Sequence, residues 1–448
     1  MTRELILGIL LEVTRDGEYS HVSLRNVLNK YQYLDKKERA FITRVTEGTL
    51  EHMIEIDYII NQFSKVKVNK MKPVIRCIIR SAVYQLKYMD SVPDSAVCNE
   101  AVKLAAKKGF STLKGFVNGV LRNVARNLDN ITYPDKTDYV SFLSIKYSMP
   151  TWILEQWLAC YEKEIVEIML EDFLKEKPTT IRCNLNVMSK EELIQSLERE
   201  GVHVESHPYL PYALQISSYD YLADLDSFQK GAFYVQDISS MLVAQIANPK
   251  EGDHIIDVCA APGGKALHMA ELLHGTGHVE ARDLTDYKVN LIRENILRSG
   301  VSNMEAVRQD ATILDETSIE KADIVVADLP CSGLGVLGKK TDLKYKMTKE
   351  TQDELVKLQR QILSKVQSYV KLEGILVYST CTIHTKENME NVHWFLKEYS
   401  QFELVPIHDL LCEELKSSVQ EEGCLQMLPG VHESDGFFIA KFKKKSQK

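Results

Sequence analysis

Two cysteines in this sequence occupy positions where a thiol could act as a nucleophile. Cys331 follows an apolar run that ends at Asp328, and Cys381 follows a second apolar run at residues 375–378. A lone cysteine is most often a small buried apolar residue, which is how we interpret the other seven. If the two runs are neighbouring parallel strands, both thiols reach one crevice at the carboxyl ends of the strands. A thiolate there could form a covalent intermediate.

A glycine-containing loop lies in the same region. Residues 259–265 read Cys-Ala-Ala-Pro-Gly-Gly-Lys and separate an expected strand from an expected helix. A phosphate-binding P-loop has a Gly where Cys259 stands and a Ser or Thr where Ala266 stands, and the dinucleotide fingerprint GxGxxG is also absent. Glycines in such a turn still let the backbone approach a ligand closely.

Acidic residues end consecutive strands around this loop. Asp283, Asp310 and Asp328 follow the second, third and fourth expected strands, and Asp283 is placed where an acid meets ribose hydroxyls. Each Asp alone could cap a helix or a turn, but three consecutive strand ends favour a ligand site. Such a crevice repels an anionic dinucleotide. S-adenosylmethionine, which has a positive sulfonium and no phosphate, fits it best.

A thiol pair beside S-adenosylmethionine indicates methylation of a pyrimidine carbon. Cytosine C5 is a poor nucleophile, and a thiolate that adds to C6 turns it into an enamine-like one. Afterwards the C5 proton must leave and the thiol must be expelled, which requires a base. An acid near the ring N3, such as Asp328, would stabilise the charge on the ring, and the nucleotide must leave its stack to be reached. Spacing alone does not say which thiol attacks.

Regular alternation of strands and helices positions these residues. It predicts a doubly wound parallel sheet, that is a Rossmann-like α/β domain over residues 233–448, with ligands at the carboxyl ends of its strands. The expected strands are 254–258, 277–283, 306–308, 324–327 and 375–378, and the expected helices are 265–274, 287–298 and 352–372.

Two further domains are expected before residue 233. Residues 1–130 repeat apolar residues near the helical period, which predicts an all-α bundle interrupted at Gly48 and Gly109. Residues 131–232 contain a proline-punctuated linker and a small α+β (RRM-like) module. Its expected strands are 179–184, 214–216 and 232–235, with a helix at 191–200.

The net charge of −8 hides an asymmetry between the two ends of the chain. Residues 1–130 carry +7 and residues 131–448 carry −15, while 65–126 alone carry +10. A basic module joined to an acidic body predicts a polyanion that is held by the first and modified by the second. A solvated basic surface is the alternative, and the length of the basic stretch favours contact with nucleic acid.

Composition favours a cytoplasmic protein without membrane association. Hydrophobic residues make up 44% and charged residues 26%, and the longest apolar run has seven residues, too few for a spanning helix. We expect no signal peptide, because this run follows Glu4 and lacks a small-residue cleavage site. Nine cysteines without a CxxC pair read as reduced thiols.

Three motifs together resemble a known family. Residues 257–265 (Asp-Val-Cys-Ala-Ala-Pro-Gly-Gly-Lys), 328–333 (Asp-Leu-Pro-Cys-Ser-Gly) and 379–382 (Ser-Thr-Cys-Thr) are similar to the RNA 5-methylcytosine methyltransferases. With a helical front that resembles the NusB-like RNA-binding domain, the chain resembles the bacterial Sun/RsmB type, which methylates 16S ribosomal RNA. The NusB-like matches are residues 38–41, 47–50 and 116–122, and further matches are 236–237, 428–430 and 435–438.

This resemblance implies roles for individual residues. Cys381 is the nucleophile, Cys331 assists release of the methylated RNA, and Asp328 contacts the cytosine. It implies that S-adenosylmethionine is bound, without a metal, by Cys259, Ala260, Ala261, Pro262, Gly263, Gly264, Lys265, Asp283, Asp310 and Asp328. The implied partner is small-subunit ribosomal RNA, free or in early assembly, and the implied state is a monomer.

The sequence departs from the family pattern at three places. Ala266 replaces a usual Thr, Leu329 stands where Ala is common, and residues 338–342 (Gly-Lys-Lys-Thr-Asp) replace an arginine-rich stretch. The last departure weakens the inference that this stretch contacts a phosphate, although Lys339 and Lys340 keep its positive charge.

Other functions remain open at this point. A transfer-RNA cytosine-C5 methyltransferase would use the same chemistry, and a non-catalytic RNA-binding antitermination factor would explain the front alone. A metal enzyme is disfavoured because His203 and His207, although at helical spacing, lack a surrounding ligand cluster. A thiol hydrolase would need a His placed on Cys331 or Cys381, and none is evident.

Overall fold

The chain forms two units, each with its own interior. A computed structural model describes residues 1–446. The helical unit comprises residues 1–174 and 337–346, and the α/β unit comprises 175–336 and the described residues from 347 onward. Among the residues described, no helix is long and apolar enough to cross a membrane.

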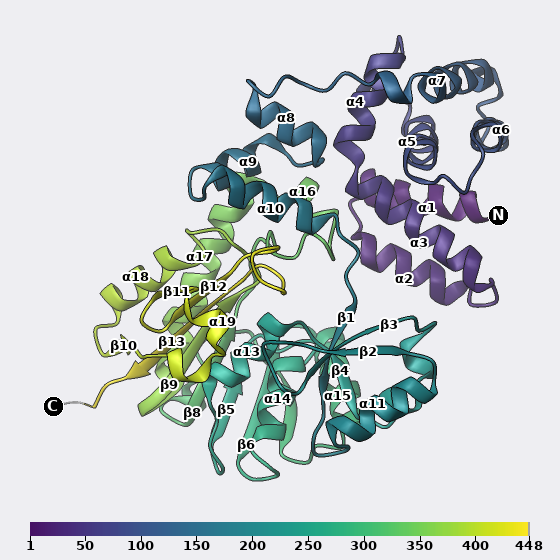
Figure 1. Ribbon diagram of the computed structural model, residues 1–448. Helices are drawn as coiled ribbons and strands as arrows, with labels where there is room; N and C mark the ends of the chain where they lie inside the picture. The colour runs from purple at the N-terminus through teal and green to yellow at the C-terminus, as the bar shows by residue number, and fades with distance from the viewer. Residues whose placement is uncertain (447–448) are drawn as a thin grey trace. The chain divides into compact units, whose positions relative to one another are not determined.

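The front of the helical unit is the predicted all-α bundle (Figure 1). Its helices are α1 Thr2–Thr14, α2 Ser20–Lys30, α3 Lys36–Glu51, α4 Met53–Phe63, α5 Pro73–Tyr88, α6 Asp94–Lys107 and α7 Lys114–Arg126. One apolar cluster, which includes Ile9, Val45, Ile59 and Leu121, fills its interior. Gly109 ends α6 with φ +85°, as expected. Gly48 does not break a helix, because it lies inside α3 where the Tyr84 ring occupies the space of a side chain.

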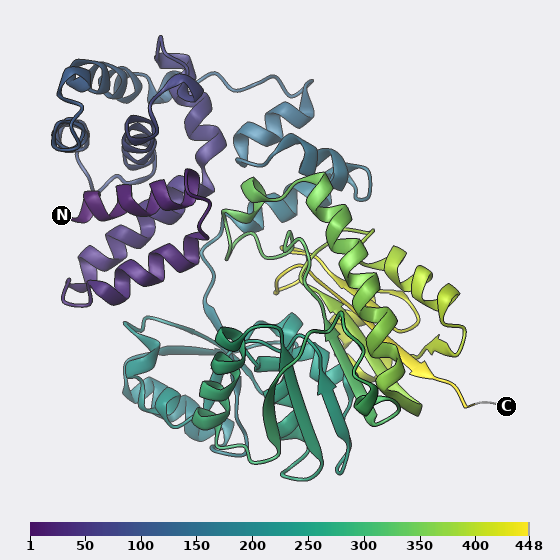
Figure 2. The ribbon, with the colours of Figure 1, turned by 180° about the vertical axis from the view of Figure 1, so that it is seen from behind.

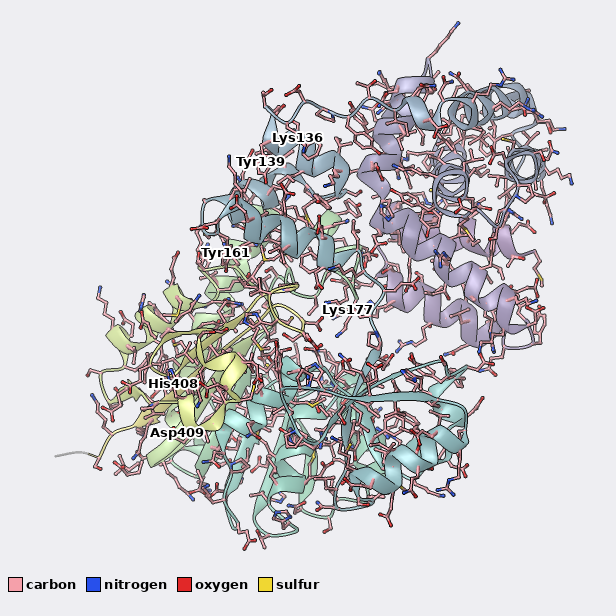
Figure 3. The ribbon with its side chains drawn as sticks, in the orientation of Figure 1. Lys136, Tyr139, Tyr161, Lys177, His408 and Asp409 are labelled. Carbon is pink, nitrogen blue, oxygen red and sulfur yellow. The ribbon has the colours of Figure 1, made fainter. Side chains whose placement is uncertain are left out.

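Three more helices complete the main part of this unit. They are α8 Tyr139–Lys146, α9 Thr151–Leu158 and α10 Lys163–Phe173. The Tyr139 hydroxyl, labelled in Figure 3, donates to Glu167 of α10 at 2.6 Å. Trp157 of α9 is fully buried and stacks on Phe173. These contacts join the three helices across short connections.

The helical unit also includes a segment from far along the chain, residues 337–346 with α16 Leu343–Lys346. Asp342 accepts hydrogen bonds from the backbone N and Oγ of Ser20, at 3.1 and 2.6 Å. Lys344 is buried and donates to the Glu51 carbonyl at 2.7 Å, and its burial lowers the pKa of Lys344 to about 7. The residues at the end of this segment therefore serve packing within the helical unit.

The predicted α+β module forms the first part of the α/β unit. Its strands are β1 Thr179–Cys183, β2 His203–Ser206, β3 Ala213–Ser217 and β4 Phe233–Val235, in the antiparallel order β2-β3-β1-β4, with α11 Lys190–Arg199 and α12 Asp226–Gln229. Strand β2 was not predicted because it is largely exposed and lacks an apolar alternation. The interpretation that His203 and His207 are spaced along a helix was wrong, because His203 lies on strand β2.

A nine-stranded sheet forms the Rossmann-like remainder, in the order β11-β12-β13-β9-β8-β5-β6-β7 with β10 beside β13. The parallel strands are β5 His254–Asp257, β6 His278–Asp283, β7 Met304–Arg308, β8 Ala322–Asp328 and β9 Val370–Thr380. The prediction of a wholly parallel sheet was wrong at one side. There, β10 Phe402–Leu404, β11 Val419–Glu421, β12 Cys424–Met427 and β13 Phe437–Lys444 are antiparallel.

Helices cover both faces of this sheet. Figure 1 shows α13 Ile238–Ala247 and α14 Gly264–Leu272 on one face, and Figure 2 shows α17 Lys349–Val366 from the other side. The remaining helices are α15 Asp286–Ser299, α18 Met389–Glu398 and α19 Glu413–Lys416. Alternate strand residues enter two separate apolar clusters: Ile255 and Val326 enter one, and Ile256 and Val325 enter the other. Helix α17 ends earlier than predicted, because strand β9 already begins at Val370.

A pair of glycine substitutions tests the packing of the helical unit. A Cβ at Gly48 would lie 2.1 Å from the Tyr84 ring, whereas a Cβ at Gly8 of α1 meets nothing within 4 Å. We expect Gly48→Ala to lower the free energy of unfolding by about 1–3 kcal/mol. Gly8→Ala should raise it by up to about 1 kcal/mol, because alanine favours the helix. Urea unfolding of the full chain, followed by circular dichroism, measures both, and equal effects would contradict the packing described.

Candidate active site

The two motif cysteines meet at the carboxyl edge of the parallel sheet. Cys331 lies on the loop after β8 and Cys381 on the loop after β9, and β8 pairs with β9. Their Sγ atoms are 3.2 Å apart and partly buried. The structure thus brings together the two thiols that the sequence singled out.

Backbone hydrogen bonds hold the two loops against each other. Leu329 N donates to the Ser379 carbonyl, and Gly335 N donates to the Cys381 carbonyl, each at 3.1 Å. Gly436 N donates in turn to the Gly335 carbonyl at 2.9 Å. A Cβ at Gly335 would lie 2.0 Å from the Gly436 carbonyl oxygen. Only glycine therefore allows this close approach of three backbone segments.

Cys331 is held as a neutral thiol. Its hydrogen bond with Cys381, its burial and the negative charges of Cys381 and Glu387 raise its pKa well above the ordinary value. A thiol that stays protonated is a poor nucleophile. It can, however, give its proton to a departing group in a later step.

Asp328 ends β8 beside the thiols and is fixed by two partners. Its Oδ2 lies 2.7 Å from Nζ of Lys265, and its Oδ1 accepts from Ser379 Oγ at 2.8 Å. Burial disfavours the charge on Lys265, but the charge and hydrogen bond of Asp328 outweigh it and raise the pKa of Lys265. The ammonium lies 5.4 Å from the centroid of the Phe437 ring. Lys265, the last residue of the predicted cofactor loop, thus points to the acid near the thiols.

The loop at residues 259–265 connects β5 to α14. Gly263 has φ +107° and lies against Ile292 of α15, a conformation that favours glycine. Ala260 N donates to the Arg282 carbonyl, and Ala261 N donates to Asp283 Oδ2 at 3.1 Å. The loop is therefore fastened to the end of β6. Burial raises the pKa of Cys259, so this thiol stays protonated.

The acids at the strand ends differ in their surroundings. Asp257 at the end of β5 is fully buried, and its Oδ2 has no hydrogen-bond partner within the described residues. Burial and the neighbouring Asp328 raise its pKa to about 7. Asp283 lies 3.1 Å from Lys288. Asp310, by contrast, accepts from the backbone N and Oγ1 of Thr312, as a turn-capping residue does.

These residues fit S-adenosylmethionine by their chemistry. The unpartnered Asp257 oxygen needs a hydrogen-bond donor, which a cationic amino group supplies. The loop glycines and the start of α14 allow close backbone contact with a ligand. Within residues 1–446, no group of three or more His, Cys, Asp or Glu is arranged to hold a metal ion.

Several site residues were not predicted from the sequence. Asp257 and Ser379 lie inside the quoted motifs, and the position of Asp257 at the end of an apolar strand is the same signal that identified the other acids. Glu387 and Gln359 are fully buried behind the cysteine loops. Their polarity in an apolar surrounding is visible only in the structure.

Comparisons with known proteins agree with this arrangement. The sequence profile of the NusB family matches residues 1–126, that of the RsmF/B-like ferredoxin-like domain matches 149–220, and that of the 16S rRNA methyltransferases RsmB/F matches 244–443. The crystal structure of PH0851 covers 99% of this chain and 98% of its own, with a TM-score of 0.83 and 26% identity. The crystal structure of NSun6 from Pyrococcus horikoshii with SFG covers 66% of this chain and 99% of its own, with a TM-score of 0.58 and 26% identity.

Relatives of similar length confirm the resemblance seen in the sequence. The probable ribosomal RNA small subunit methyltransferase B of Bacillus subtilis (strain 168) is 35% identical, over 99% of this chain and 98% of its own. The ribosomal RNA small subunit methyltransferase B of Escherichia coli O1:K1 / APEC is 28% identical over the same shares. By this likeness over its whole length, the chain belongs to the ribosomal RNA small subunit methyltransferase B family.

Proposed function

We propose that this enzyme transfers a methyl group from S-adenosylmethionine to C5 of a specific cytosine in small-subunit (16S) ribosomal RNA. The observation that carries the proposal is the pair of thiols, 3.2 Å apart, at the edge of the sheet that also holds the glycine loop and the buried acids. We place the enzyme in the cytoplasm, as a monomer that acts on free or early-assembly RNA.

The two cysteines take separate parts in the reaction. Cys381 Sγ adds to C6 of the cytosine, and the C–S bond makes C5 nucleophilic. Bound S-adenosylmethionine supplies the methyl group for C5. The C5 proton then leaves to a base, and the C–S bond breaks as its electron pair returns to the Cys381 sulfur. Cys331, whose raised pKa keeps it protonated, assists this release by giving its proton to that sulfur.

Asp328 and the cofactor loop position the two substrates. Asp328 contacts the cytosine near N3, where its pairing with Lys265 keeps the carboxyl group in place. We propose that Asp257 joins the loop in holding S-adenosylmethionine. The full set is Asp257, Cys259, Ala260, Ala261, Pro262, Gly263, Gly264, Lys265, Asp283, Asp310 and Asp328.

We divide the chain by function into residues 1–130 for RNA binding, 131–232 for the linker and α+β module, and 233–448 for catalysis. In this division the first domain supplies the surface that holds the RNA. Arg80, Lys87 and Lys107 form ion pairs with acids of the bundle that lie outside 65–126, so part of the +10 is neutralised locally. Other basic residues of 65–126 are exposed, and we refer to the following seven as the basic patch: Lys65, Lys67, Lys70, Lys72, Lys114, Arg122 and Arg126.

Trapping of the covalent intermediate tests the two cysteine roles. Without Cys331 the adduct should persist, so Cys331→Ala expressed in cells should show a slow, RNase-sensitive band on a denaturing gel. Cys381→Ala should show none, because no adduct forms. Exposed Cys160 provides the control: Cys160→Ala should behave as wild type.

The RNA in that band identifies the substrate. Sequencing should return 16S ribosomal RNA, whereas transfer RNA would establish the alternative methyltransferase. A band in Cys381→Ala alone would mean that the roles are exchanged. A non-catalytic antitermination factor would give no band and no binding of S-adenosylmethionine in calorimetry.

The raised pKa of Asp257 predicts pH-dependent cofactor binding. Below about pH 7 the carboxyl group is protonated and cannot pair with a cationic amino group, so affinity should fall as pH decreases from 7 to 5.5. Asp257→Asn should remove this dependence and weaken binding by about 2 kcal/mol, roughly 30-fold. Calorimetry with S-adenosylmethionine measures both effects. The exposed Asp286→Asn serves as control, and an unchanged pH dependence in Asp257→Asn would contradict the assignment.

Salt dependence tests the basic patch. The triple variant Lys67→Gln, Lys70→Gln and Arg126→Gln should flatten the slope of log affinity against log salt by about 2, near 0.7 for each phosphate that is no longer neutralised. The control replaces Lys103, Lys107 and Lys108, which already pair with Glu100 or Glu4, and should change the slope less. Filter binding with 16S RNA fragments measures both. Equal slopes in the patch variant and wild type would refute the RNA-holding role.

A further inference from the structure

A fully buried carboxylate lies behind the two cysteine loops. Glu387 is 0% exposed and follows Cys381 in the segment between β9 and α18. Its Oε2 accepts from the Ser332 backbone N and from Gln359 Nε2, both at 2.9 Å. Its Oε1 accepts from Ser332 Oγ at 2.5 Å and lies 3.3 Å from His384 Nδ1. Three donors thus converge on one carboxylate.

The partners of Glu387 are the neighbours of the two thiols. Ser332 follows Cys331 directly, and its Oγ is 2.8 Å from Oγ1 of Thr382, which follows Cys381 directly. Because Ser332 Oγ donates to the carboxylate, Thr382 must donate to Ser332. The chain of hydrogen bonds runs from Glu387 through Ser332 to the residue beside the nucleophile.

Gln359 of α17 extends this support to the other side of Cys331. Its Nε2 donates to the Pro330 carbonyl at 2.9 Å as well as to Glu387. The carboxylate therefore holds Cys331 through the residues on both of its sides, directly at Ser332 and through Gln359 at Pro330. Both cysteines lie on loops, which have no ladder of regular hydrogen bonds to fix them.

We propose that Glu387 is a positioning residue for the reaction proposed above: through Ser332, Thr382 and Gln359 its carboxylate holds both thiols where they serve the same cytosine. Catalytic groups need to be held within about 0.5 Å of their productive placement, by partners that are themselves fixed. A buried carboxylate that accepts three hydrogen bonds meets this requirement, and an amide at the same place does not. Its NH₂ group would face the donors of Ser332 and Gln359.

The same carboxylate also acts on Cys331 by its charge. The groups that raise the pKa of Cys331 are Cys381 and Glu387, and Tyr378 of β9 also interacts electrostatically with it. Loss of the Glu387 charge, with Cys381 and Tyr378 unchanged, lowers the pKa of Cys331. This shift of the pKa of Cys331 can be measured separately from any change in the stability of the fold.

The test compares Glu387→Gln, Glu387→Asp and Ser332→Ala in the full chain, with Glu390→Gln, exposed in the first turn of α18, as the control. Methyl transfer to 16S ribosomal RNA gives kcat and KM, and calorimetry gives the Kd of S-adenosylmethionine. We expect Glu387→Gln to lower kcat about 100-fold, the effect of a misplacement of about 1 Å. KM for RNA and the cofactor Kd should stay within about threefold. Glu387→Asp should recover part of kcat, and Glu390→Gln should have the kcat of wild type. The kcat of Ser332→Ala should lie between those of Glu387→Gln and wild type.

A second measurement requires no RNA. Peptide mass spectrometry follows alkylation of Cys331 by iodoacetamide as a function of pH, and Glu387→Gln should shift the profile to lower pH. Wild-type kcat in Glu387→Gln would overturn the proposal, as would an unchanged alkylation profile together with loss of cofactor binding. If wild type itself transfers no methyl group to RNA, the proposed function fails, and the alkylation shift still decides whether Glu387 acts on Cys331.

Discussion

The parallel register between β8 and β9 is the constraint on which the site depends. Asp328 lies opposite Ser379 in this register, and the two side chains are hydrogen bonded. Both strands end at the same edge of the sheet. Cys331 lies three residues after Asp328 and Cys381 two residues after Ser379, and their sulfurs are in contact. A slip of one residue would turn every side chain of one strand to the opposite face. Burial of both faces prevents it, because each face fills its own apolar cluster.

Burial also sets the electrostatics of this edge of the sheet. An acid taken out of water is costly unless it is paired. Asp328 pairs with Lys265 and Ser379, while one oxygen of Asp257 has no partner among residues 1–446 and the pKa of Asp257 is raised. A fold that needed only stability would not retain an orphaned buried carboxylate, and such groups cluster at functional sites. The proposed cationic cofactor accounts for it.

The sequence predicted the elements whose patterns are local. The apolar strands β5, β6 and β8 and the helices between them were found because buried strands between amphipathic helices give a clear periodicity. Their order in space then followed from the rules for parallel sheets, which is why the thiols could be placed at one edge. The antiparallel strands β10 to β13 were not predicted. A short apolar run does not reveal whether it will pair parallel or antiparallel to its neighbour.

Long-range contacts account for the other differences. Gly48 reads as a helix break, but the Tyr84 ring needs its missing side chain. Asp342 and Lys344 were grouped with the catalytic domain, yet they bind Ser20 and the Glu51 carbonyl in the helical unit. Glu387 reads as an ordinary charged residue, and only the fold shows it buried. In each case the partner lies far away in the sequence or on another element.

Covalent trapping with a fluorinated substrate shows directly whether Cys381 attacks the cytosine. In 16S RNA made with 5-fluorocytidine, fluorine replaces the proton that must leave C5, so the wild-type enzyme should remain covalently attached after methyl transfer. Digestion with nuclease and protease, followed by mass spectrometry, identifies the modified cysteine. We expect a methylated fluorocytidine on the peptide that contains Cys381. A nucleotide on the Cys331 peptide, or turnover of the fluorinated RNA without any adduct, would contradict it.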